Sequence, residues 1–168
     1  MSSTFEQTLD RYAEVAIRIG LNLQVGQRLL ITDVRRGGVP IETAPLIRSL
    51  TAHAYAAGSP LVHVMWRDDA LIRTRFERAP HDSFGEYPDW VARGLLEHVQ
   101  GGGALLTVQA GNPDLLKDQD PAIVAGIQKL AFEKNKVLSE LAGRNAYNWV
   151  VISASYSGWA AKVFPDLP

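Results

Sequence analysis

The hydrophobic residues of this chain follow two spacings, one typical of amphipathic helices and one typical of buried strands. Apolar side chains recur at intervals of three and four residues after Thr4, a residue suited to a helix N-cap, until Gly20. Short apolar runs follow glycines instead, as at residues 28–33. The patterns predict helices over residues 5–19, 41–57, 70–78, 90–99 and 121–141, and strands over residues 28–33, 61–66, 104–109 and 149–153.

The order of these elements indicates the fold class. Strands that alternate with helices pair in parallel through right-handed crossovers. We therefore expect an α/β fold: an open, doubly wound, mainly parallel sheet of about four strands with helices on both faces. The 168 residues form one domain on this interpretation, because a domain of about 150 residues already buries about 68–70% of its unfolded surface.

Composition narrows the possible partners. The chain has 17 basic and 18 acidic residues and a net charge of -1, which gives no dense positive face for nucleic acid or an anionic membrane. It has no cysteine, so disulfides, thiolate metal sites and cysteine nucleophiles are excluded and a cytoplasmic location fits best. No apolar run approaches the roughly 20 residues of a membrane span, and the first residues lack the pattern of a signal peptide.

In an open parallel sheet, ligands bind beyond the carboxyl ends of the strands. The loop from Asp33 to Gly38 follows the first strand and contains Arg35 and Arg36. Backbone N–H groups and two guanidinium groups there would suit a phosphate or carboxylate. The alternative is a solvated turn whose glycines supply positive φ, and we favour it because neither a dinucleotide fingerprint nor a P-loop lysine is present.

Two other phosphate-related interpretations are disfavoured. Gly101 to Gly103 precede a strand and therefore lie at the opposite end of the sheet, as a helix-to-strand turn. A receiver-type phosphoacceptor domain needs an aspartate after the third strand, where this chain has Gln109.

Carboxylates and histidines near the second strand invite a metal-site hypothesis. We expect none, because the four histidines fall on different elements without a paired spacing. Asp68 or Asp69 suits a helix N-cap, and His63 suits a hydrogen-bonded core position. Ser153, Ser155 and Ser157 show no sign of a positioned base. We therefore assign no catalytic, cofactor-binding or metal-binding residue in this chain. The residues considered for a metal site or for acid–base chemistry are Trp66, Arg67, Asp68, Asp69, His53, His63, His81, His98, Asp82 and Glu86.

Several segments taken in order resemble the thermophilic-type metallo-aminopeptidases, the family of aminopeptidase T, AmpS and PepS. A YAE-like helix runs into the turn Gly20-Leu21-Asn22-Leu23-Gln24-Val25-Gly26-Gln27, which is similar to the family's G-x-N-L-Q-x-G-Q turn. Each further match is weak alone, and the ordered set is fairly specific: residues 44–48, 103–106, 112–116, 144–145, 148–149 and 159–165.

The resemblance implies a cytoplasmic, dimeric exopeptidase that acts on peptides with two divalent ions, zinc or cobalt, which polarise the scissile carbonyl and activate water. Family members are more than twice as long, and the resemblance places their metal ligands beyond the position of Pro168. We therefore expect this chain to be the N-terminal domain, to bind neither ion and to be inactive alone. The alternative is a naturally truncated binding or interaction module.

Overall fold

A computed structural model describes residues 4–154 and 156–166. The four predicted strands are present as β1 (Leu29–Thr32), β3 (Val62–Val64), β5 (Ala104–Gln109) and β6 (Trp149–Ser153), with short β2 (Val39–Pro40) and β4 (Trp66–Arg67). The α-helices are α1 (Phe5–Val15), α2 (Ala44–Ala56), α3 (Asp69–Arg78), α4 (Asp89–Gln100), α5 (Pro121–Lys134), α6 (Lys136–Gly143) and α7 (Ser157–Val163). A π-helix covers Ala16–Gly20, and 3-10 helices cover Ile41–Thr43 and His81–Gly85.

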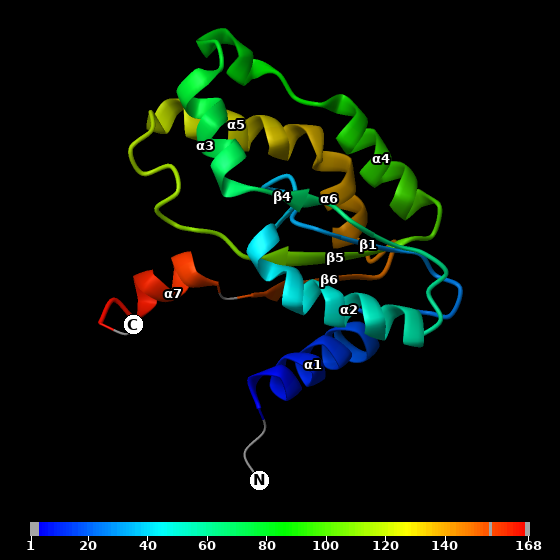
Figure 1. The fold of residues 1–168 in the computed structure, drawn as a ribbon. Coiled ribbons are helices and arrows are strands. Elements are labelled where there is room, and N and C mark those ends of the chain that lie inside the picture. Colours follow the sequence, from blue (N-terminus) through cyan, green and yellow to red (C-terminus); the bar gives the residue numbers. More distant parts are fainter. Residues whose placement is uncertain (1–3, 155, 167–168) are drawn as a thin grey trace.

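The main sheet confirms the expected fold class. Its four strands run in the order β3-β1-β5-β6, and every neighbouring pair is parallel. Helices α1 and α2 cover one face, and α4, α5 and α6 lie on the other (Figure 1). The strand order reverses direction between β1 and β5, which is where open α/β sheets usually place a ligand crevice.

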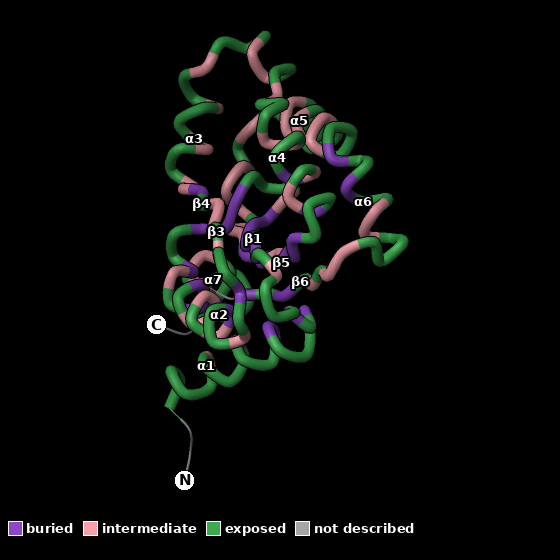
Figure 2. The backbone as a smooth tube through the Cα atoms, turned by 90° about the vertical axis from the view of Figure 1, so that its right-hand side faces the viewer, coloured by how far each residue is buried: buried purple, intermediate pink, exposed green. Residues whose placement is uncertain are grey.

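The two faces of the sheet have separate cores of unequal size. The larger core joins α1, the π-helix and α2 to one face of the sheet, and it includes Ile31 and Leu106, both fully buried. The smaller core lies under α4 and α6 and centres on Leu30 and Leu105. Within the main sheet, most residues of β1 and β5 are buried, whereas most residues of β6 are exposed or half-buried (Figure 2).

The strand predicted over residues 61–66 is divided between two sheets. Met65 donates its N–H to the Ile31 carbonyl of β1, while its own carbonyl accepts from Val39. Beyond Met65 the chain pairs with β2, because the turn after β1 brings Val39 and Pro40 alongside Trp66 and Arg67. The second sheet of β2 and β4 therefore depends on a contact between distant segments, and the hydrophobic pattern did not predict it.

The single helix predicted over residues 121–141 is also wrong, since it breaks at Asn135. The buried Asn135 amide donates to the Tyr87 hydroxyl and to the Ala131 carbonyl, and its backbone leaves helical geometry at φ -103 and ψ 13. A side chain that bonds nearby backbone in this way competes with the helix. Asp120 caps α5 and Pro121 opens it, as predicted.

Other local predictions have mixed outcomes. Thr4 and Gln7 form a capping box, and Asp68 caps α3 through the Ala70 N–H. Gly102 turns between α4 and β5 with φ +82, at the end of the sheet opposite the carboxyl ends. His63 is a correction: it is exposed on β3 rather than buried in the core, because β3 is an edge strand.

Candidate functional site

The loop after β1 is organised around the buried carboxylate of Asp33. One oxygen of that carboxylate accepts from the backbone N–H groups of Arg35 and Arg36 at 3.1 and 3.3 Å. The other oxygen lies 3.4 Å from the Arg36 guanidinium. Asp33 therefore occupies the N–H groups that an anion would need, so the loop is a self-contained turn and any anion would depend on the arginine side chains.

A second polar cluster lies where β4 meets the carboxyl ends of the main sheet. Arg67 is buried and donates to the Ala110 carbonyl at 2.7 Å. Its Nη1 lies 2.9 Å from Asp69 Oδ1, which makes the two side chains an ion pair. Asp69 Oδ1 has no hydrogen bond of good geometry to any described group, so the attraction between the two is electrostatic. The other Asp69 oxygen accepts from the Tyr156 hydroxyl at 2.9 Å. The cluster thus ties β4 and α3 to the start of α7.

Tyr156 gives this cluster a measurable pH signature. Burial, and then the neighbouring Asp69 carboxylate, raise the pKa of Tyr156 from 10.0 to about 12. Because the folded state holds the phenol proton more tightly, the stabilisation is complete below pH 10.0 and is lost as pH rises through about 12. We expect Tyr156→Phe to remove this part of the pH dependence. Urea unfolding of the parent chain and of Tyr156→Phe between pH 10 and about pH 12 measures this difference. If the free energy of unfolding fell in parallel for both proteins, the assignment to Tyr156 would be contradicted.

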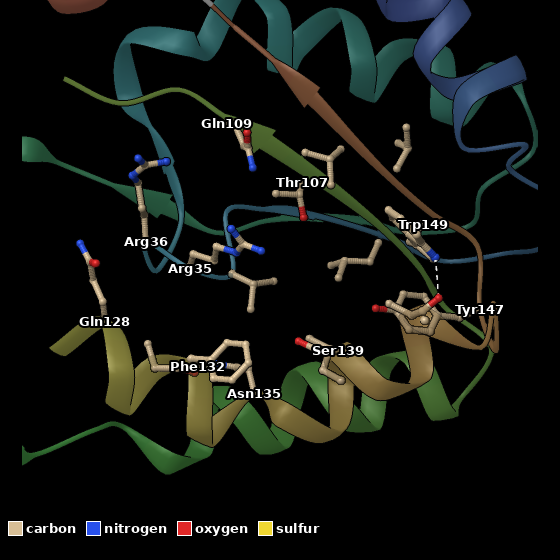
Figure 3. A pocket seen from close by; sticks show the side chains of 18 residues that line it. Arg35, Arg36, Thr107, Gln109, Gln128, Phe132, Asn135, Ser139, Tyr147 and Trp149 are labelled. Carbon is tan, nitrogen blue, oxygen red and sulfur yellow. Dashed lines mark hydrogen bonds between the residues drawn. The ribbon is translucent and has the colours of Figure 1, made fainter. Parts of the chain in front are cut away.

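An open groove lies between the sheet and helices α5 and α6 (Figure 3). It has a volume of about 910 Å³. Its floor consists of alternate residues of two paired strands, Leu105, Thr107 and Gln109 on β5 and Trp149 and Val151 on β6. The loop carrying Arg35 and Arg36 lines one end, at the switch in strand order between β1 and β5.

The far wall of the groove combines apolar and polar groups. Phe132 is 63% exposed there. Asn135 also lines the groove, and its Oδ1 is buried without a hydrogen-bond partner among the described residues. None of the described residues that line the groove has an acidic side chain. The groove can therefore accept a carboxylate at the arginine end, and its described lining offers no carboxylate or imidazole that could act as a general base.

The residues weighed as metal ligands are not brought together. Asp68 and Asp69 are at the start of α3, whereas His81, Asp82 and Glu86 lie exposed beyond its end. Within residues 4–154 and 156–166 no group of three or more His, Asp or Glu side chains is arranged to hold a metal ion. The described residues therefore do not fit a two-metal centre.

The remaining candidates also stay separate. His53 lies 3.0 Å from Asp10, between α2 and α1, and the His98 ring lies 2.9 Å from the Ala104 carbonyl at the opposite end of the sheet. Ser153 and Ser157 have no histidine partner among the described residues, and Ser155 lies outside them. No helix in the described segments is long and apolar enough to span a bilayer.

Sequence reasoning missed the groove and the Arg67 cluster. Tyr156 and Asp69 are 87 positions apart, and no local spacing reports such a contact. Asn135 carried one usable signal, since a residue that favours caps and turns within a predicted helix suggests a break.

Comparisons with known proteins agree with the motifs. A family model described as thermophilic metalloprotease (M29) matches residues 5–168. Over 165 residues the chain is 41% identical to aminopeptidase 2 of Geobacillus stearothermophilus and 36% identical to aminopeptidase AmpS of Bacillus subtilis. These matches cover 97% and 96% of this chain and 38% of each relative. The resemblance predicted from the sequence is confirmed.

Structure comparison gives the same picture. The chain is similar to a solved structure of wild-type AmpT from Thermus thermophilus, with a TM-score of 0.89 and 33% identity. The match covers 98% of this chain and 40% of that one. This chain therefore spans about two-fifths of the length of the proteins it matches.

Proposed function

Because this chain belongs to the thermophilic metalloprotease (M29) family, we propose that it is the N-terminal α/β domain of a two-metal aminopeptidase. The whole enzyme would release N-terminal amino acids from peptides. The observation that carries the proposal is the continuous match to aminopeptidases over almost the whole chain, at up to 41% identity, combined with coverage of 38% of the relative's length. The chemistry would reside in the part of the protein that this match does not reach.

Metal ions enter this proposal through the family alone. Two divalent ions, zinc or cobalt, would supply Lewis-acid activation of water and of the scissile carbonyl when bound. Their ligands would come from the remainder of the enzyme, and this domain would support packing between domains or subunits. The homo-oligomeric state is proposed from the family resemblance alone. A cytoplasmic location fits the cysteine-free sequence, and the absence of a nucleic-acid or membrane partner fits its net charge of -1.

We expect residues 1–168 alone to show no aminopeptidase turnover. Joined to the part of Geobacillus stearothermophilus aminopeptidase 2 that lies beyond the matched segment, the same residues should give a chimera that cleaves an aminoacyl chromogenic substrate. Activity should require added zinc or cobalt and disappear with chelator, since the ions would activate the attacking water. Initial rates for the chain, the chimera and unmodified aminopeptidase 2 form the comparison.

Two outcomes would count against this function. Chelator-sensitive turnover by the isolated chain would show that it has its own metal site. A chimera that folds cooperatively and binds metal but cleaves nothing would favour a separate binding module. Reading the gene beyond the codon for Pro168 is a further check, because an open frame that encodes Glu and His metal ligands supports the enzyme and a stop codon supports the truncated module.

A further inference from the structure

We propose that the groove between β5–β6 and α5–α6 is the docking surface for the remainder of the M29 chain, the part that follows the segment matched here. This inference rests on the proposed function and adds which surface is used and which chemistry its occupant carries. The occupant presents apolar side chains to the sheet and a carboxylate to Arg35.

The first argument is the contrast between the two faces of one strand. On the face toward α1 and α2, Ala104, Leu106 and Val108 are completely buried. On the groove face, exposure increases along the same strand from buried Leu105 to exposed Gln109. A central strand of a doubly wound sheet is normally covered on both faces. At the carboxyl end of β5, the face toward α5 and α6 lacks this cover.

Exposed apolar groups continue this uncovered area onto the edge strand and the helix opposite. Trp149 and Val151 on β6 are 42% and 45% exposed, and Phe132 on α5 is more exposed still. Phe132 and Trp149 line the same groove (Figure 3), and Val151 belongs to its lining as well. Contiguous apolar surface of this kind usually marks an interaction site.

The polar groups of the groove define the chemistry of the occupant. The Arg35 side chain has no ion-pair or hydrogen-bond partner among the described residues, and the lining has no acid to neutralise it. Asn135 Oδ1 also lacks a partner among the described residues, but it is fully buried and an occupant of the groove does not reach it. A carboxylate on the occupant would pair with the Arg35 guanidinium.

The length of the relatives identifies the source of that segment. Aminopeptidase 2 and AmpT extend far beyond the portions, 38% and 40%, that this chain matches. Their additional residues must pack against the matched domain somewhere. The groove combines a large uncovered apolar area with the unpaired Arg35 guanidinium, whereas the opposite face of the sheet is already filled by α1 and α2.

Thiol labelling tests this placement, because the chain has no cysteine of its own. Val151→Cys places a thiol in the groove, and Val15→Cys places a control thiol on α1, where Val15 is 51% exposed. Each variant is made in the isolated chain and in the chimera with aminopeptidase 2. Maleimide labelling of each peptide is followed by mass spectrometry, which separates these thiols from any in the added part.

We expect labelling at position 151 to slow at least about tenfold in the chimera, as protection of a covered site requires, while position 15 changes little. Equal labelling at position 151 in both proteins, or equal slowing at both positions, would overturn the proposal. A concentration-dependent dimer of the isolated chain that protects position 151 would also overturn it and favour a second copy as the occupant.

Two single charge-reversal variants, one in the groove and one outside it, test whether the occupant places a carboxylate near Arg35. Arg35→Glu in the chimera should lower the melting temperature by several degrees relative to Arg48→Glu, a control on the exposed surface of α2. In the isolated chain the two variants should melt together. If Arg35→Glu and Arg48→Glu had equal melting temperatures in the chimera, the proposed carboxylate next to Arg35 would be refuted.

Failure of this inference can be distinguished from failure of the proposed function. An active chimera with an unprotected position 151 refutes the docking surface alone, whereas a protected position in an inactive chimera refutes the enzyme alone. If the chimera does not fold, the solved AmpT chain decides: its corresponding groove must be filled by residues outside the matched 40%, and an open groove there would overturn the proposal.

Discussion

Replacing Leu106 with alanine is expected to lower the free energy of unfolding by about 2–5 kcal/mol, the range measured when a buried leucine leaves a cavity. Leu106 is completely buried in β5, which pairs with both β1 and β6. Its side chain belongs to the core shared with α1 and α2, so the surrounding elements cannot collapse into the space without losing their own packing. Chemical denaturation gives the value directly.

Leu71→Ala is the matched control, since Leu71 on α3 is 69% exposed. Its removal takes little apolar surface out of the core, and a surface change of this kind usually stays within about 0.5 kcal/mol. If the two alanine variants unfolded at the same denaturant concentration, the larger core would not be the main source of stability.

Gly38→Ala should be comparably damaging, for a backbone reason. Gly38 has φ +141, and an added Cβ would lie 2.8 Å from the Trp66 carbonyl carbon and 2.9 Å from the Met65 oxygen. These are backbone atoms of the segment that pairs with β2, so relief requires the small sheet to separate and to release Arg67. We expect a loss of at least about 3 kcal/mol from strain and overpacking together.

Two glycine controls separate the causes of that loss. Gly37 has φ +75 with open space around a Cβ, so Gly37→Ala should cost about 1–2 kcal/mol from left-handed backbone alone. Gly126 lies in α5 with nothing within 4 Å, and Gly126→Ala should stabilise by about 0.5–1 kcal/mol. Thermal unfolding should show Gly38→Ala as the least stable variant, Gly37→Ala as intermediate and Gly126→Ala as the most stable. If Gly38→Ala and Gly37→Ala lost similar amounts of stability, the clash between the added Cβ and the backbone of residues 65–66 would be excluded.

The sequence by itself determined the fold class, because each main strand carries its signal within a few residues. The runs ending at Thr32 and Gln109 are apolar enough to require burial, and Asp120 and Pro121 define a helix start through local backbone chemistry. The family could also be inferred from the sequence, since ordered short motifs such as the turn from Gly20 to Gln27 need no coordinates.

Tertiary structure alone decided how distant segments meet. Arg67 contacts Ala110 and Asp69 because β4 pairs with β2 and does not continue β3 in the main sheet. The apolar pattern of residues 61–66 cannot report that change of partner, and it also misplaced His63. The groove has the same origin: Trp149 and Arg35 are far apart in sequence, and whether a half-buried strand is covered depends on how α5 and α6 pack, which follows from the break at Asn135.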